Sequence, residues 1–200
     1  MNLKELRAIN IITGDTFSGK TKLLKEINKE IDNSKFIDFE TFDTETKNEV
    51  ADAKWIEHWF RFVFGVAFKK DEKSSYALEI LKVGLSCKEG DAFIIRNAET
   101  NLHIKSVNKI AKFFTYLASQ KGIKVILETN AVDILNSICY EVFAKNIDSN
   151  SVIFLHKKDE NSIEKIYVNN KGKFTNEDGS LRKYASGFFD ANTAELWKLL

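Results

Sequence analysis

An eight-residue segment near the N-terminus limits the folds that this chain can adopt. Residues 14–21 read GDTFSGKT, so the segment begins with a glycine and ends with glycine, lysine and threonine. The apolar run Ala8–Thr13 precedes it, and Lys20–Ile31 carries leucine and isoleucine at helical spacing. A buried strand, a glycine-containing turn and an amphipathic helix, in this order, form the unit from which parallel sheets with flanking helices are built.

The rest of the chain continues this alternation of strand and helix patterns. Short apolar runs predict strands at Lys35–Phe39, Ala92–Ile95 and Lys124–Leu127. Apolar residues at helical spacing predict helices at Trp55–Phe68, Tyr76–Leu85, Val107–Ser119 and Ala131–Phe143. A polar turn separates an expected antiparallel pair, Val152–His156 and Glu164–Val168. We therefore expect an α/β fold with a mostly parallel sheet flanked by helices and a short antiparallel C-terminal extension, in one domain over residues 1–200.

Composition excludes few function classes. The 30 basic residues nearly balance the 29 acidic ones, so the charge gives no general support for nucleic-acid or membrane binding, although it does not exclude a local patch. The sequence has neither a signal peptide nor an apolar run near the ~18 residues of a membrane helix, so we expect a cytoplasmic protein. Cys87 and Cys139 lie in apolar stretches at no metal or redox spacing, which predicts buried free thiols.

The segment at residues 14–21 fits the pattern G-x-x-x-x-G-K-[ST], which is typical of a phosphate-binding loop. The first turn of a helix has unpaired N–H groups and a partial positive charge, and glycine lets phosphate oxygens come close to the backbone. We expect Lys20 to hold the β- and γ-phosphates of ATP and Thr21 to bind Mg²⁺. The remaining loop residues supply backbone donors: Gly14, Asp15, Thr16, Phe17, Ser18 and Gly19. The alternative is a glycine turn that only caps a helix.

Five segments match, in chain order, the pattern of one group of ATPases. They are Ile11–Leu24 (IITGDTFSGKTKLL), Lys73–Leu85 (KSSYALEILKVGL), Phe93–His103 (FIIRNAETNLH), Val125–Leu135 (VILETNAVDIL) and Gly187–Asp190 (GFFD). They resemble the loop entry, signature helix, Walker B segment, switch segment and C-terminal tail of ABC/SMC-like ATPase heads. The tail is similar to that of bacterial ATPases from phage-defence and overcoming-lysogenization systems. The resemblance implies a P-loop NTPase that forms a homo-oligomer or pairs with a partner ATPase or effector chain, in antiviral defence.

The chain departs from this group at four positions. Arg96 stands where the Walker B aspartate would be, Asn97 at the catalytic glutamate, Asn130 at the switch histidine and Tyr76 at the signature glycine. Arginine stays protonated and cannot act as a base, although Arg96 could supply positive charge where Mg²⁺ normally sits. Asn97 can orient a water but cannot take its proton. The resemblance therefore implies an ATP-binding head with weak or no hydrolysis, and an insertion reduced to residues 40–72.

Two acids remain as candidate catalytic residues, together with Asn97. Glu99 either lies near the phosphates or caps the helix that follows it. Glu128 ends an expected parallel strand, where ligand sites form in such sheets, and it could replace the missing acid.

Two other functions are open. A small-molecule kinase of the shikimate or nucleotide kinase type suits a chain of 200 residues and would use the acids that follow the first helix, at Asp38 and Glu40. Against it, the chain has four arginines, whereas phosphoryl transfer relies on arginine to neutralise charge. An interaction module that lost its nucleotide is the other option, and the intact loop argues against it.

Overall fold

The computed structural model describes residues 3–41, 52–67 and 75–182, in which strands and helices alternate. The strands are β1 (Ile9–Gly14), β2 (Ser34–Asp38), β3 (Ala92–Arg96), β4 (Lys124–Glu128), β5 (Val152–Lys157), β6 (Ile163–Val168) and β7 (Phe174–Thr175). The α-helices are α1 (Lys20–Glu30), α2 (Ala53–Phe64), α3 (Tyr76–Ser86), α4 (Ile104–Gln120) and α5 (Val132–Phe143). Short 3₁₀ turns occur at η1 (Leu3–Glu5), η2 (Phe39–Thr41) and η3 (Ser149–Ser151).

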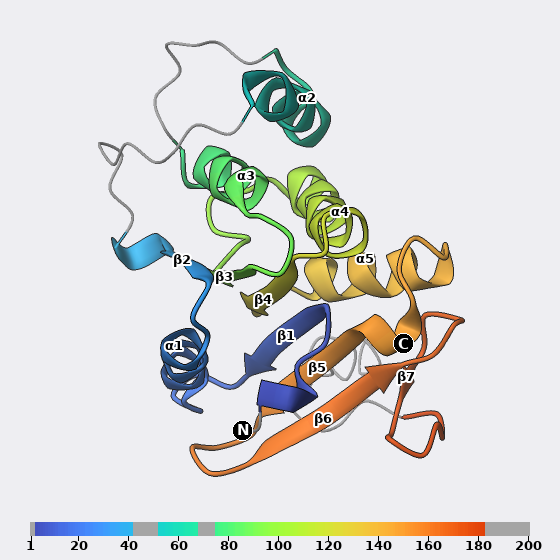
Figure 1. Cartoon of the computed structure of the whole chain (residues 1–200). Coiled ribbons are helices and arrows are strands. Elements are labelled where there is room, and N and C mark those ends of the chain that lie inside the picture. The colour runs from blue at the N-terminus through green and yellow to red at the C-terminus, as the bar shows by residue number, and fades with distance from the viewer. Residues whose placement is uncertain (1–2, 42–51, 68–74, 183–200) are drawn as a thin grey trace, which may run out of the picture.

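The strands form one sheet in the order β2-β3-β4-β1-β5-β6-β7 (Figure 1). Strands β2, β3, β4, β1 and β5 are parallel, whereas β6 is antiparallel to β5 and β7 is antiparallel to β6. The expected α/β fold with a mostly parallel sheet and an antiparallel C-terminal part is therefore confirmed. Strand β1 lies between β4 and β5, so the loop that follows β1 begins in the interior of the sheet.

Helices cover both faces of this sheet. On one face, α1 packs its Leu23, Leu24 and Ile27 against alternate residues of the central strands, such as Ile94 and Ile126. On the other face, α3, α4 and α5 pack against the intervening strand residues, and α2 lies outside α3 and α4 (Figure 1). Both faces of the central strands are therefore buried, which explains why their sequences are mostly apolar and do not alternate with polar residues.

Caps at the helix ends account for the boundaries that differ from the sequence-based expectation. Helix α2 ends at Phe64, before the expected Phe68, because Gly65 adopts a left-handed conformation with φ 75° and donates its N–H to the Arg61 carbonyl. Helix α4 begins at Ile104, before the expected Val107, because the His103 side chain caps it by accepting a hydrogen bond from the Lys105 N–H.

The structure confirms some of the other expectations, and some fall outside the described residues. Cys87 and Cys139 are buried free thiols, as expected. Strand β7 was not foreseen, since two residues carry no readable periodicity. Part of the expected insertion at 40–72, the first residues of the signature-like helix and the GFFD segment lie outside the described residues, which exclude 42–51, 68–74 and 183–200. Across the described ranges, no helix has both the length and the apolar character to span a membrane.

The burial of His156 predicts a pH-dependent contribution to the stability of the fold. His156 is buried on β5, and this burial lowers the pKa of the imidazole, although Glu164 and Asp15 oppose the shift. Lys158 and Arg182 lower the pKa further. Below an ordinary histidine pKa of about 6.5 the unfolded chain binds this proton and the folded chain resists it. The free energy of unfolding should therefore fall as the pH falls through about 6.5, by at most ~1.4 kcal/mol per pH unit from this group.

We expect His156→Gln to reduce this slope. The measurement is urea unfolding at several pH values between about 5 and 7.5, which bracket the ordinary pKa. The matched control is His58→Gln at an exposed position of α2, which should keep the slope of the unsubstituted protein. An unchanged slope in His156→Gln would contradict the prediction.

Candidate functional site

The loop begins with a glycine that the packing of β5 requires. Gly14 has φ 140°, and a Cβ atom placed on it would lie 2.0 Å from the backbone oxygen of Lys157. This contact arises because Gly14 and Lys157 are register partners in β1 and β5. Gly19 closes the loop with φ 87° and precedes α1 without any side-chain cap. Both glycines therefore hold backbone shapes that a side chain would disturb.

The loop presents main-chain donors that no described residue satisfies. Within the loop, the Ser18 N–H donates to the Asp15 carbonyl at 3.2 Å. Among the described residues, no hydrogen bond is accepted from the N–H groups of five other loop positions: Thr16, Phe17, Gly19, Lys20 and Thr21. The Ser18 hydroxyl is also buried without a described partner. Such a group of donors at a helix N-terminus suits an anion.

Lys20 is buried at the start of α1, with its ammonium over the loop. Its Nζ donates to the Gly14 and Asp15 carbonyls, each at 2.6 Å. Burial lowers the pKa of Lys20, and the charges of Glu128 and Asp15 oppose that shift. An ammonium has three donors, so the two carbonyl bonds do not exhaust the capacity of Lys20 to bind a ligand.

Thr21 connects the loop to the end of β4. Its hydroxyl donates to Glu128 Oε1 at 3.0 Å, and Glu128 is only 4% exposed. Glu128 Oε2 has no hydrogen-bond partner among the described residues and lies 3.6 Å from Arg96 Nε. Burial raises the pKa of Glu128, while the Thr21 hydrogen bond and the Arg96 and Lys20 charges lower it. Glu128 is therefore the candidate acid that touches the loop.

Arg96 is held by acids from β2, β4 and the turn η2. Its Nη1 lies 3.2 Å from Asp38 Oδ1 and 2.5 Å from Glu40 Oε2. The hydrogen bond with Glu40 raises the pKa of Arg96 and lowers that of Glu40. Register explains the cluster, because Asp38, Arg96 and Glu128 are successive partners across β2, β3 and β4. The positive charge of Arg96 is thus balanced by carboxylates within the cluster.

The other two candidate catalytic residues have contacts away from the loop. Glu99 accepts hydrogen bonds from the Thr129 hydroxyl at 2.8 Å and the Asn130 N–H at 3.2 Å. It joins the turn after β3 to the turn after β4, and the expectation that it caps the next helix is wrong because His103 caps α4. Asn97 has φ 54°, and its N–H donates to the Glu128 carbonyl at 3.0 Å.

The sequence pattern of the loop predicts neither the exposure of Phe17 nor the position of Lys157 beside the loop. Phe17 has φ 66° and is 94% exposed, so its side chain is not buried in the loop. Lys157 is buried beside the loop, with its Cε 3.7 Å from the position that a Cβ on Gly19 would occupy. Its Nζ donates to the Glu160 carbonyl at 2.7 Å. The sequence carries no signal for Lys157, because its place depends on pairing between β5 and β1.

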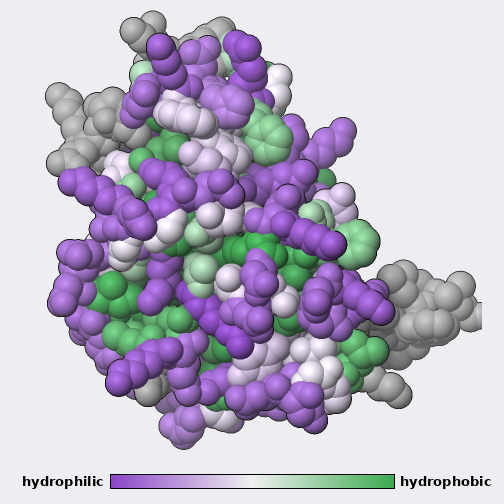
Figure 2. Space-filling view, turned by 45° about the vertical axis from the view of Figure 1, so that its right-hand side comes forward, coloured by the Kyte–Doolittle hydropathy of each residue, from purple (hydrophilic) through white to green (hydrophobic). Residues whose placement is uncertain are grey.

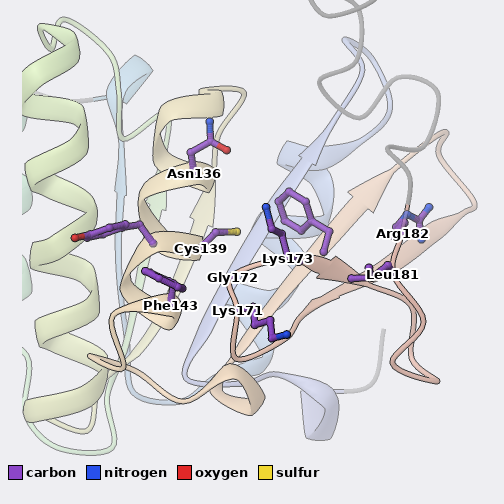
Figure 3. A pocket seen from close by; sticks show the side chains of 10 residues that line it. Asn136, Cys139, Phe143, Lys171, Gly172, Lys173, Leu181 and Arg182 are labelled. Carbon is purple, nitrogen blue, oxygen red and sulfur yellow. The ribbon is translucent and has the colours of Figure 1, made fainter.

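A separate cavity of about 500 Å³ lies between α5 and the turn before β7. Cys139 and Phe143 line it from α5, and Lys171 and Lys173 line it from the turn (Figure 3). None of its lining residues belongs to the 14–21 loop. The cavity therefore adds nothing to the chemistry of the loop.

On the face drawn in Figure 2, hydrophobic residues form separate areas interrupted by hydrophilic ones.

A metal ion at this site would need ligands in addition to the protein side chains. In the part of the chain that the structure describes, no group of three or more His, Cys, Asp or Glu residues is placed to hold a metal ion. Mg²⁺ commonly takes one or two protein oxygens together with phosphate oxygens and waters, so the Thr21 hydroxyl fits a nucleotide-borne ion.

Comparison with known proteins does not identify a family. No protein-family model matches the chain, and no curated protein matches its sequence. The function must therefore be argued from the residues and their geometry.

Proposed function

We propose that the chain binds ATP and Mg²⁺ at residues 14–21 and acts as a nucleotide-dependent assembly or switch subunit with weak or no hydrolysis. One observation carries this proposal. Five N–H groups between Thr16 and Thr21 make no hydrogen bond to a described residue, and they lie beside the buried ammonium of Lys20. A polyphosphate supplies acceptors for all of these donors at once. The buried Ser18 hydroxyl adds a further donor that no described residue uses.

The loop residues have distinct parts in this proposal. Lys20 donates to the β- and γ-phosphates through the ammonium that lies over the loop carbonyls of Gly14 and Asp15. Thr21 offers its hydroxyl oxygen to Mg²⁺, which neutralises phosphate charge when bound. Gly14 and Gly19 keep the backbone free of side chains where the phosphates approach.

Weak hydrolysis follows from the residues at the end of β3. Arg96 cannot act as a base, and its guanidinium is paired with Asp38 and Glu40. Asn97 cannot accept a proton from water, and a positioned general base contributes about 10²–10⁴-fold to a rate. Glu99 is engaged by Thr129 and Asn130. Phosphate release at the rate of an ordinary ATPase, about 10 s⁻¹, would contradict this part of the proposal.

The small-molecule kinase is less well supported by the geometry. Asp38 and Glu40, which that function would use to bind an acceptor substrate, both pair with Arg96. A screen of small acceptors with labelled ATP tests this alternative, and a phosphorylated product would overturn our preference.

Partner binding remains a proposal that rests on the resemblance to ABC/SMC-like heads. We propose that ATP promotes a homo-oligomer, or pairing with a second ATPase or an effector chain, in antiviral defence. Sedimentation velocity with ATP and Mg²⁺ tests self-association. If the protein still sediments as a monomer with ATP and Mg²⁺, the result would count against the homo-oligomer.

ATP should stabilise the folded protein. A ligand that binds only the folded state at 100 times its Kd adds about 2.7 kcal/mol to the free energy of unfolding. For a domain of this size, that corresponds to a rise in Tm of about 5–10 °C. The measurement is thermal unfolding with ATP and Mg²⁺, with AMP as the control because it lacks the β- and γ-phosphates. A flat response to ATP would favour the interaction module that has lost its nucleotide.

A further inference from the structure

We propose that Glu128, at the end of β4, is the carboxylate that supports the nucleotide's Mg²⁺ beside Thr21, in place of an acid at the end of β3. This inference rests on the proposed function, because the ion arrives with ATP. It assigns the supporting acid to a different strand from the one that the sequence resemblance indicates.

Strand order places the end of β4 next to the strand that leads into the loop. Strand β4 pairs directly with β1, and Glu128 is the register partner of Ile12, two residues before Gly14. Strand β3 is separated from β1 by β4, so Arg96 lies one strand further away. An acid at the end of β4 therefore reaches Thr21 across a single strand spacing, as the 3.0 Å hydrogen bond shows.

The direction of that hydrogen bond prepares Thr21 for a cation. The Thr21 hydroxyl donates its proton to Glu128 Oε1, so the lone pairs of its oxygen remain for a metal ion. Mg²⁺ keeps several of its waters, and those waters need acceptors. Glu128 Oε2 is such an acceptor, because it is buried and has no described hydrogen-bond partner. The buried Ser18 hydroxyl, also without a described partner, independently indicates that the loop is built for a ligand.

Arg96 acts in this arrangement as a positioning residue. Its Nη1 is held by Asp38 and Glu40, and its Nε lies 3.6 Å from Glu128 Oε2. This distance exceeds that of a hydrogen bond, so Arg96 attracts the carboxylate without using the oxygen's lone pairs. Arg96 therefore keeps Glu128 beside Thr21 and leaves an oxygen available to metal-bound water.

The test is the Mg²⁺ dependence of ATP binding in Glu128→Gln, which keeps the shape of the side chain and removes its charge. Calorimetry gives the ATP affinity with Mg²⁺ and with EDTA for each protein. We expect Glu128→Gln to lose at least about tenfold of the Mg²⁺-dependent gain in affinity, equivalent to ~1.4 kcal/mol. Its affinity in EDTA should stay within about twofold of the unsubstituted protein, since the proposed role of the carboxylate is toward the metal ion and Thr21 and not toward the phosphates. Glu26→Gln, at an exposed position of α1 outside the loop, is the control for loss of a carboxylate and should keep the full gain.

Mn²⁺ bound to the ATP complex provides a second readout through its paramagnetic resonance signal. The signal of bound Mn²⁺ should weaken in Glu128→Gln and persist in Glu26→Gln. If Glu128→Gln does not fold, Glu128→Asp carries the same test, because it withdraws the carboxylate by one methylene and keeps its charge. Unchanged metal dependence in the folded variant would overturn the role of Glu128, while ATP binding itself would remain. Absence of ATP binding in the unsubstituted protein would overturn the proposed function instead.

Discussion

Lys20→Ala should remove measurable ATP binding and leave the fold intact. Hydrogen bonds to charged groups contribute about 1.5–3 kcal/mol each, so loss of contacts to the β- and γ-phosphates should weaken binding by at least about 100-fold. Stability should change little, because burial disfavours the Lys20 ammonium and its described bonds go to two carbonyls. The measurements are calorimetric titration with ATP and urea unfolding of the free protein.

The matched control for this experiment is Lys22→Ala. Lys22 lies two residues further along α1 with an exposed side chain, so this variant loses the same charge without touching the loop. Its ATP affinity should remain within about threefold of the unsubstituted protein, because exposed charges are screened by solvent and salt. Undiminished affinity in Lys20→Ala would mean that the loop does not hold the phosphates in the proposed way.

Gly14→Ala should be among the most destabilising single substitutions in the chain. Its Cβ would lie 2.0 Å from the Lys157 carbonyl oxygen and 2.9 Å from the carbonyl carbon, and both are backbone atoms of β5. Backbone atoms in a central strand cannot move without loss of the pairing between β1 and β5. Overpacking alone costs about 1–3 kcal/mol, and a backbone with φ 140° adds strain for an L-residue, so we expect a loss of at least ~3 kcal/mol.

Gly90→Ala separates the clash from the backbone strain. Gly90 also has a positive φ, at 87°, but a Cβ atom there would meet nothing within 4 Å. This control should lose only about 1–2 kcal/mol, the cost of a left-handed conformation for an alanine. Urea unfolding of both variants gives the comparison. Equal losses of stability in the two variants would show that the Lys157 backbone does not lie as close to Gly14 as described.

Local periodicity was sufficient to predict most elements of the fold. Lys124–Leu127 and Ala131–Phe143 were expected as strand and helix, and they correspond to β4 and α5. The hydrophobic pattern succeeds here because each buried element must present apolar side chains at its own period. Errors occurred where a single contact decides a boundary, as with the His103 side chain at the start of α4.

The sequence alone determined the phosphate-loop pattern, because its glycines, lysine and threonine are consecutive and their chemistry is local. Only the tertiary structure decided which acid accompanies them. Thr21 and Glu128 are 107 residues apart and meet because β4, rather than β3, lies beside β1. Arg96 joins Asp38 from 58 residues away for the same reason of strand register. The central parallel strands share the same mostly apolar pattern, so their order depends on how the whole domain packs and cannot be read from any one of them.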